Sequence, residues 1–439
     1  MTLSHNHADA ADDFFGRSTP EELIENFGSP LYVYNENILR ARCRALKALS
    51  ADPGFKVCYS TKANGNPHLL RIIREEGSAA DAMSPGELAV LRRAGFPRKD
   101  TCYVCNNVSR EELALACREA DHVSVDSVSQ MESFGQVNPD GEIMIRVNPG
   151  IGAGHHDKVV TAGKNTKFGI VPDDFDAVRD ILRKYRLTLI GLNQHVGSLF
   201  MDPKPYLDAA AWLLRTAERF PDIRLIDFGG GFGIPYRRRE GEKALDMRAF
   251  GEKFDALLGA FRARTGYAGE FLIEPGRYVT AECSVLLGRV HAVKNNGPVR
   301  YVGTDIGFNV LARPVMYDAF HDVVVYGRQS GNAAAPGAER PGGEFGTPAA
   351  YARERPLMTQ TIVGNICETG DVLAGERELP EAVVGDIIGV LDAGAYGHAM
   401  SSNYNQRLRP AEVLITADGR NRLIRRRDTV EDLLTVYPE

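Results

Sequence analysis

The sequence lacks long apolar runs and a strong net charge, and its number of cysteines is odd. No stretch approaches the roughly 18 apolar residues of a membrane span, so we expect no membrane association. A net charge of −6 gives no electrostatic case for nucleic acid. The first 16 residues lack the basic and apolar regions of a signal peptide. The seven cysteines are scattered and odd in number, so we expect reduced thiols and a cytoplasmic location.

Motifs typical of metal sites are scarce as well. Cys102 and Cys105 form a C-x-x-C motif, but no second pair and no spaced histidine pair accompanies them. The two cysteines lie in a strand-like run, which favours core packing over metal binding. His155 and His156 lie in a glycine-rich loop and are also more typical of a non-metal role. We therefore predict no metal site.

A βαβα rhythm runs through residues 30–280 of the 439. Strands are predicted at 56–60, 101–105, 122–126, 142–148, 188–195, 223–228 and 270–274. Helices are predicted at 66–76, 84–94, 109–119, 172–186, 205–219 and 247–264. This alternation indicates a parallel sheet, and seven or eight units can close it into a (β/α)₈ TIM-type barrel. An open doubly wound sheet is the alternative.

The rhythm changes after residue 280. The later segments are β-prone with few helices between them, which predicts a separate, mostly antiparallel β domain over 281–439. Its strands are expected at 283–295, 299–305, 321–326, 358–364, 385–391 and 411–415. Residues 327–356 are rich in Gly, Ala and Pro and are predicted to form a long surface loop.

The candidate chemistry begins at Lys62, which follows the strand-like 56–60. A parallel barrel places its chemistry at this end of its strands, and a lysine buried there could act as an amine nucleophile. The glycines at 229–231 let backbone N–H groups approach an anion. Glu274 ends another strand and could keep a pyridine nitrogen protonated. This set suits pyridoxal phosphate (PLP) held as a Schiff base, although a tight turn and a capping glutamate are simpler readings of the last two features.

Further polar residues could complete such a site. His195, at another strand end, could stack on a flat ring, and Ser198 could reach a phosphate. Arg277 and Arg313 could clamp a carboxylate in bidentate fashion. A structural histidine and surface arginines are the alternatives. Three consecutive arginines at 237–239 and three more at 425–427 are read as solvated surface.

The chain resembles PLP-dependent decarboxylases with the alanine-racemase-like fold (fold type III), and among them the diaminopimelate decarboxylases most. The shared motifs occur in the family's order and span about residues 25–425. They are 59–64 (YSTKAN), 81–87 (DAMSPGE), 165–169 (NTKFG), 195–198 (HVGS), 229–233 (GGGFG), 274–277 (EPGR), 313–317 (RPVMY), 367–371 (CETGD), 392–397 (DAGAYG) and 401–405 (SSNYN).

The resemblance implies an N-terminal barrel, a C-terminal β domain that also takes up residues 1–29, and a homodimer with shared active sites. It implies that Lys62 forms the Schiff base, with His195 and Cys367 as the other catalytic residues. The implied cofactor-binding residues are Lys62, Asp81, His195, Ser198, Gly229, Gly230, Gly231, Glu274, Gly276, Arg277 and Tyr396. The implied substrate-binding residues are Arg277, Arg313, Tyr317, Glu368 and Tyr396, with Cys367 and Glu368 supplied by the partner chain.

The implied reaction is decarboxylation of meso-2,6-diaminopimelate to L-lysine. Three alternatives stay open: a decarboxylase of ornithine or of a carboxylated polyamine or siderophore intermediate, a non-catalytic PLP-binding homologue, and an amino-acid racemase. Retention of both Lys62 and the β domain disfavours the non-catalytic homologue. Glu368 with the Arg277 and Arg313 pair favours a substrate with a distal carboxylate, because a buried arginine left unpaired would cost a few kcal/mol.

Overall fold

The computed structural model describes residues 14–150, 167–220, 222–327 and 355–438. The chain divides into two compact units. The barrel unit comprises residues 39–235 and 242–280, and the β unit comprises residues up to 38, 236–241 and 281–439. The pair His155 and His156 and nearly all of the loop expected at 327–356 lie outside the described residues.

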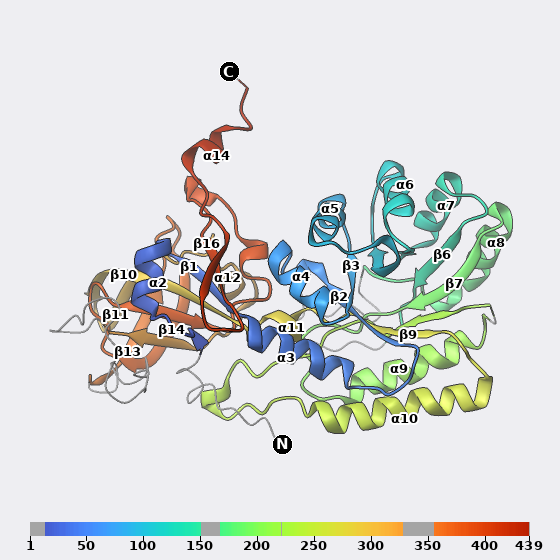
Figure 1. Ribbon diagram of the computed structural model, residues 1–439, viewed down its shortest axis with the longest axis horizontal. Coiled ribbons are helices and arrows are strands. Elements are labelled where there is room, and N and C mark those ends of the chain that lie inside the picture. The colour runs from blue at the N-terminus through green and yellow to red at the C-terminus, as the bar shows by residue number, and fades with distance from the viewer. Residues whose placement is uncertain (1–13, 151–166, 221, 328–354, 439) are drawn as a thin grey trace. The chain divides into compact units, whose positions relative to one another are not determined.

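Eight parallel strands close into a barrel in the first unit (Figure 1). They are β2 (Phe55–Ser60), β3 (Ala79–Ala82), β4 (Thr101–Val104), β5 (His122–Val125), β6 (Glu142–Arg146), β7 (Thr188–Asn193), β8 (Leu225–Asp227) and β9 (Glu270–Ile273). Closure comes from the pairing of β9 with β2, in which Phe55 is opposite Phe271. The predicted barrel is confirmed, and the open doubly wound sheet is wrong.

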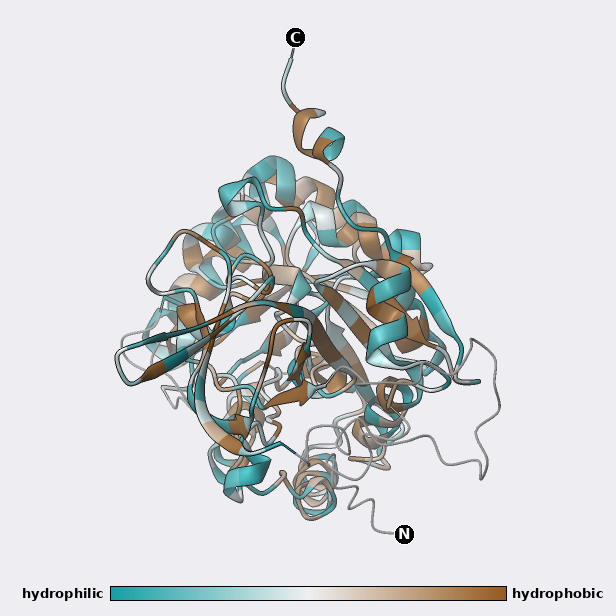
Figure 2. Cartoon of the chain, turned by 90° about the vertical axis from the view of Figure 1, so that its left-hand side faces the viewer, coloured by the Kyte–Doolittle hydropathy of each residue, from teal (hydrophilic) through white to brown (hydrophobic). Residues whose placement is uncertain are grey.

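Helices alternate with these strands, and several of the helices begin at a polar capping residue. The helices are α3 (Glu36–Lys47), α4 (Pro67–Glu75), α5 (Pro85–Ala94), α6 (Arg110–Glu119), α7 (Val128–Val137), α8 (Phe175–Tyr185), α9 (Lys204–Ala217), α10 (Met247–Thr265) and the short α11 (Arg277–Thr280). Asn66, Ser84, Ser109 and Ser127 each accept a hydrogen bond from a first-turn N–H of the helix that follows. Hydrophobic and hydrophilic residues share these helices (Figure 2), as one buried face requires. No helix in the described ranges combines the length and the apolar character needed to cross a membrane.

One buried cluster of the barrel unit draws an apolar residue from each of six strands. Its members are Cys58, Cys102, Met144, Ile190, Leu225 and Leu272, with Ala79 packed against it. Cys102 therefore packs in this apolar layer, and Cys105 is a buried free thiol. Because side chains alternate along a strand, the next side chain on the same face lies two residues further toward the carboxyl end. This spacing positions the polar layer described below.

The β unit contains a nine-stranded, mostly antiparallel sheet, as predicted. Its strands are β1 (Leu31–Asn35), β10 (Ser284–Asn296), β11 (Val299–Thr304), β12 (Val323–Tyr326), β13 (Leu357–Val363), β14 (Val372–Pro380), β15 (Ile387–Leu391), β16 (Ala411–Ile415) and β17 (Asn421–Arg425). The main path runs β14-β13-β11-β10-β1-β16-β17, and β15 joins β10 to β12. Only β1 with β16 and β11 with β13 are parallel pairs among those described.

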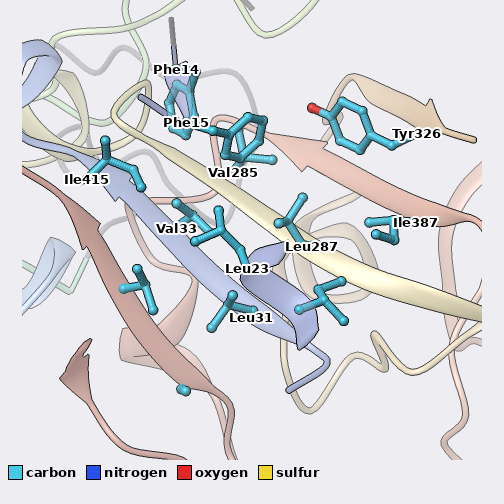
Figure 3. Close-up of a cluster of buried hydrophobic side chains, with 13 residues drawn as sticks. Phe14, Phe15, Leu23, Leu31, Val33, Val285, Leu287, Tyr326, Ile387 and Ile415 are labelled. Atoms are coloured by element: carbon cyan, nitrogen blue, oxygen red, sulfur yellow. The ribbon is translucent and has the colours of Figure 1, made fainter. Parts of the chain in front are cut away.

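Strand β1 lies inside this sheet, between β10 and β16. The boundary expected at residue 30 would have assigned it to the barrel, but Leu31 is instead opposite Leu287 of β10 and Ala411 of β16. Leu31 and Val33 join a buried hydrophobic cluster with side chains from β10 and β16, and with Leu23 of α2 (Pro20–Phe27) (Figure 3). The early strand is therefore part of the core of the β unit.

Candidate active site

A polar layer lies two residues beyond the apolar layer of the barrel. Its members, each within one residue of the carboxyl end of its strand, are Ser60, Asp81, Arg146, Asp227 and Glu274. They interact with one another: Ser60 Oγ lies 2.9 Å from Asp81 Oδ2, and the charges of Asp227 and Arg146 act on Glu274. The carboxyl ends of the strands thus gather acids, a cation and a hydroxyl in one place.

Lys62 lies in a single 3-10 turn (Thr61–Ala63) directly after β2. The turn is held by Ser60 N–H donating to the Pro275 carbonyl at 3.0 Å and by the Tyr59 hydroxyl donating to the Asn64 carbonyl at 3.1 Å. Lys62 is half-buried. Burial raises the pKa values of Asp81 and Glu274, and the charge of Lys62 opposes that rise. Burial lowers the pKa of His195, and the same charge adds to that fall, so the amine lies within electrostatic reach of all three side chains.

Glu274 is 3% exposed. Burial, followed by the Asp227 carboxyl, raises the pKa of Glu274 well above its usual range. Its Oε1 atom is buried and has no hydrogen-bond partner among the described residues. An unsatisfied oxygen on a buried acid calls for a donor that the described residues do not supply. A protonated pyridine nitrogen is such a donor, so this carboxyl fits the ring of PLP.

Asp81 and Asp227 are two further buried acids of the polar layer. Burial, followed by the charge of Glu274, raises the pKa of Asp81 to about 7. Burial raises the pKa of Asp227 to about 7 as well, although the Gly229 N–H, which donates to its Oδ1 at 2.9 Å, opposes the rise. Three acids in one buried layer favour retention of protons there and attraction of a cationic group.

His195 follows β7 and is half-buried. Burial, followed by the charges of Lys62 and Arg146, lowers its pKa well below the usual range. The Gly230 N–H donates to His195 Nδ1 at 3.2 Å. The ring is therefore neutral near pH 7 and carries its proton on Nε2, a state that suits stacking on a flat ring rather than ion pairing.

The glycine run after β8 is packed against neighbouring backbone. A Cβ at Gly230 would lie 2.0 Å from the Glu274 carbonyl oxygen, and one at Gly231, where φ is +105°, would lie 2.3 Å from the Gly197 carbonyl oxygen. Only glycine allows this loop to approach so closely both the segment after His195 and the strand end that carries Glu274. The resulting run of small residues suits a phosphate cradle.

Ser198, Gly276 and Arg277 also belong to the barrel unit. Arg277 begins α11, is 6% exposed, and donates from Nη2 to Ser198 Oγ at 2.9 Å. Gly276 is buried directly before it. A buried guanidinium beside a hydroxyl is a suitable receptor for an anionic group.

The remaining predicted residues lie in the β unit. Arg313 begins α12 (Arg313–Tyr317) and is buried, whereas Tyr317 at its end is half-buried. Cys367 and Glu368 are exposed. Tyr396 is half-buried and has a positive φ of 57°, a left-handed conformation that costs free energy in a non-glycine residue and is often found at functional sites.

The loop that carries Cys367 and Glu368 is well anchored. Asp371 accepts hydrogen bonds from the backbone N–H groups of Phe308 and Ile366, both at 2.7 Å. Tyr404 donates its hydroxyl to Glu368 Oε1 at 2.6 Å. The exposed thiol and carboxylate are therefore presented by a fixed turn.

Sequence reasoning missed Ser60, which lies inside the motif of the lysine, and the two charged residues Arg146 and Asp227 of the polar layer. Arg146 lies 4.5 Å from the ring centroid of Phe168 and acts electrostatically on Glu274 and His195. For Asp227 the sequence pattern predicts only a position in the strand that precedes the glycines. The signal that could have found both charged residues is the period of two: each follows an apolar interior residue, Met144 or Leu225, by two positions.

The family model for the pyridoxal binding domain of pyridoxal-dependent decarboxylases matches residues 36–281. A diaminopimelate decarboxylase of Methanothermobacter thermautotrophicus is 37% identical over 95% of this chain and 94% of its own length. A crystal structure of a diaminopimelate decarboxylase has a TM-score of 0.84 at 32% identity, covering 99% of this chain and 98% of that one. The Helicobacter pylori enzyme complexed with L-lysine has a TM-score of 0.81 at 26% identity, covering 95% and 99%.

These matches extend over both units of the chain. The cofactor is pyridoxal phosphate, which agrees with the unsatisfied Glu274 oxygen and the glycine loop beside it. The protein is accordingly a decarboxylating lyase, and the chain belongs to the diaminopimelate decarboxylase family of PLP-dependent decarboxylases.

Proposed function

We propose that this enzyme decarboxylates meso-2,6-diaminopimelate to L-lysine and carbon dioxide, the last step of lysine biosynthesis. The observation that carries the proposal is the 37% identity to a diaminopimelate decarboxylase over 95% of the chain. The complex of the H. pylori relative with L-lysine, the expected product, supports the same reaction.

The barrel unit is proposed to hold the cofactor. Lys62 would bind it covalently, His195 would stack on its ring, and Glu274 would pair with the ring nitrogen. Asp81 lies beside the lysine. The phosphate is proposed to be held by hydroxyl, backbone and guanidinium donors of Ser198, Gly229, Gly230, Gly231, Gly276 and Arg277, and Tyr396 of the β unit is proposed as a further contact of the cofactor. When bound, PLP supplies an electron sink for cleavage of a bond to the substrate Cα.

The acids of the polar layer are proposed to control the charge of the ring. Glu274 is buried beside Asp227, and both pKa values are raised. A cationic ring nitrogen relieves the unpaired Oε1 of Glu274 and satisfies its buried carboxylate. His195, neutral with its Nδ1 occupied by the Gly230 N–H, leaves the positive charge on the ring nitrogen rather than competing with it.

The far end of the substrate is proposed to be read by charged groups. Arg277, Arg313 and Tyr317 bind the distal carboxylate, and Glu368 accepts from the amino group beside it. A site built from such donors rejects analogues that lack the carboxylate, because its polar groups are then left unpaired. Lysine and ornithine are therefore expected to be poor substrates.

Cys367 is proposed to act as a catalytic thiol in the active site of a partner subunit. The support is that Cys367 and Glu368 are exposed on an anchored turn and available to a second copy of the chain. We therefore propose a homodimer with shared active sites, without nucleic-acid or membrane partners.

A cytoplasmic location is proposed as well. All seven cysteines are free thiols, which supports it.

A substrate panel tests the proposed reaction. Purified enzyme with PLP is supplied with meso-diaminopimelate, L-lysine, ornithine, arginine or a carboxylated polyamine, and carbon dioxide release is measured. The proposal expects kcat/KM for meso-diaminopimelate to exceed every other value by orders of magnitude. Equal or faster turnover of ornithine or of the carboxylated polyamine would assign the enzyme to that substrate instead.

A further inference from the structure

The guanidinium of Arg313 is held by a histidine and an aromatic ring. Arg313 is 2% exposed, and its Nη1 lies 2.7 Å from Nε2 of His321, which is 1% exposed. Its Cζ lies 4.9 Å from the centroid of the Tyr236 ring. The ring of His321 in turn meets that of Tyr236 edge to face, with centroids 5.2 Å apart. The three side chains form one buried group within the β unit.

The tautomer of His321 follows from its second contact. His321 Nδ1 lies 2.8 Å from the Leu391 carbonyl oxygen, which can only accept a hydrogen bond. Nδ1 therefore carries the ring proton, and Nε2 presents a lone pair to the Arg313 N–H. In this contact the guanidinium donates to a neutral ring. Arg238 of the same unit, by contrast, donates to charged partners, because it forms ion pairs with the carboxylates of Glu282 and Asp392.

The backbone around His321 fixes where its ring lies. The Leu391 N–H donates to the Asp322 carbonyl at 2.9 Å while the Leu391 carbonyl accepts from His321. The next pair in the register is Val323 opposite Val390, where β12 joins β15. The imidazole is thus tied to the end of β15 on one side and to Arg313 on the other.

We propose that His321 is a positioning residue for Arg313, which orients the guanidinium toward the distal carboxylate of the substrate without neutralising it. The inference rests on the proposed function, in which Arg313 binds that carboxylate. A carboxylate at the position of His321 would orient the guanidinium equally well but would cancel the charge that the substrate needs. A neutral acceptor with a fixed tautomer orients it at no such cost.

Two amide substitutions separate the two contacts of the ring. In His321→Asn, the shorter amide can replace Nδ1 and keep the bond to the Leu391 carbonyl, but it loses the acceptor for Arg313. In His321→Gln, the longer amide can place its oxygen where Nε2 lies and keep that acceptor. The holoenzyme variants are compared for kcat and KM with meso-diaminopimelate, for the inhibition constants of L-lysine and of 1,5-diaminopentane, and for thermal stability. L-Lysine, the product, keeps the distal carboxylate, whereas 1,5-diaminopentane has no carboxylate. His291→Gln, at an exposed histidine of the same unit, is the control.

The proposal expects His321→Asn to raise KM for meso-diaminopimelate on the order of tenfold. Its kcat and the inhibition constant of 1,5-diaminopentane should change little, whereas the inhibition constant of L-lysine should rise together with KM. His321→Gln should restore both KM and the inhibition constant of L-lysine to near the wild-type values. In an Arg313→Ala background, His321→Asn should have no further effect on KM, because its effect acts through the arginine. His321→Phe, which keeps a ring but no acceptor, replaces the asparagine variant if the latter does not fold.

Three results would overturn the proposal. They are an equal loss of meso-diaminopimelate and 1,5-diaminopentane binding, an effect of His321→Asn that adds fully to that of Arg313→Ala, and a wild-type KM in both acceptor-free variants. Failure of the proposed function is distinguished by the wild type, which would then release no carbon dioxide from meso-diaminopimelate and would overturn both claims. Normal wild-type turnover with any of the three results would overturn the role of His321 alone.

Discussion

Asp81 should destabilise the cofactor-free protein in a way that depends on pH. Its side chain is 4% exposed, and its pKa is raised to about 7 by burial and by Glu274. In the unfolded chain the pKa of an aspartate is near 3.9, and the difference between the two pKa values corresponds to about 4 kcal/mol of folding free energy. Because the pKa is higher in the folded chain, Asp81 is protonated in the folded chain but ionised in the unfolded chain at pH values between the two pKa values. The cost is therefore absent below about pH 4, grows as pH rises, and is complete above about pH 7.

Asp81→Asn removes this cost and keeps an oxygen for the Ser60 hydroxyl, which now lies 2.9 Å from Asp81 Oδ2. The substitution should raise the free energy of unfolding of the cofactor-free protein by about 1.5 kcal/mol at pH 5 and about 4 kcal/mol at pH 8. Urea unfolding followed by circular dichroism at several pH values measures it. A gain that is the same at every pH, or a loss at pH 8, would refute the assigned burial of a raised-pKa acid.

Asp52→Asn is the matched control with the opposite sign. Asp52 pairs with Arg262, whose Nη2 lies 2.7 Å from Asp52 Oδ1, and this hydrogen bonding lowers the pKa of the carboxyl. Its stabilisation is present above the unfolded pKa and is lost as pH falls through the folded pKa. Asp52→Asn should therefore destabilise the protein at pH 8 and do so less at low pH.

Three further predictions concern the active site. Glu274→Gln should lower kcat by several powers of ten, each worth about 1.4 kcal/mol, while PLP absorbance shows that the cofactor still binds; near-normal turnover would contradict its role. Gly230→Ala should weaken PLP binding measured by equilibrium titration, because its Cβ would lie 2.0 Å from the Glu274 carbonyl oxygen; an unchanged affinity would argue against the cradle. Mixing inactive Lys62→Ala and Cys367→Ala protomers should restore part of the activity, since a mixed dimer has one intact site; no recovery after proven subunit exchange would place the site within one chain.

The barrel could be predicted because most of its strands are rich in aliphatic, aromatic or β-branched residues. β3 (Ala79–Ala82) was missed because three of its four residues are alanine, which has low β-propensity. Its strand geometry is imposed by pairing with β2 and β4 on either side. β14 and β17 were missed because exposed polar residues interrupt their pattern. In these three strands, tertiary pairing outweighs local propensity.

The candidate site was predictable where a residue type carries its own chemical signal. Lys62 and the glycines stand out in this way, whereas Arg146 and Asp227 look like ordinary strand-end charges until the apolar layer beneath them is known. The arginine run at 237–239 was read as solvated, yet Arg238 is half-buried and forms ion pairs with Glu282 and Asp392. These carboxylates lie far away in sequence, so no local pattern indicates the pairs.

Mapping of the covalently bound cofactor tests the central claim most directly. The purified holoenzyme is reduced with borohydride, digested and analysed by peptide mass spectrometry. Lys56, an exposed residue of β2 whose Nζ lies 2.5 Å from Glu270 Oε1, is the internal comparison. The polar layer at the barrel mouth predicts a reduced pyridoxyl adduct on Lys62 and none on Lys56. An adduct on any other lysine, or no adduct in an enzyme that is active with PLP, would contradict the assignment.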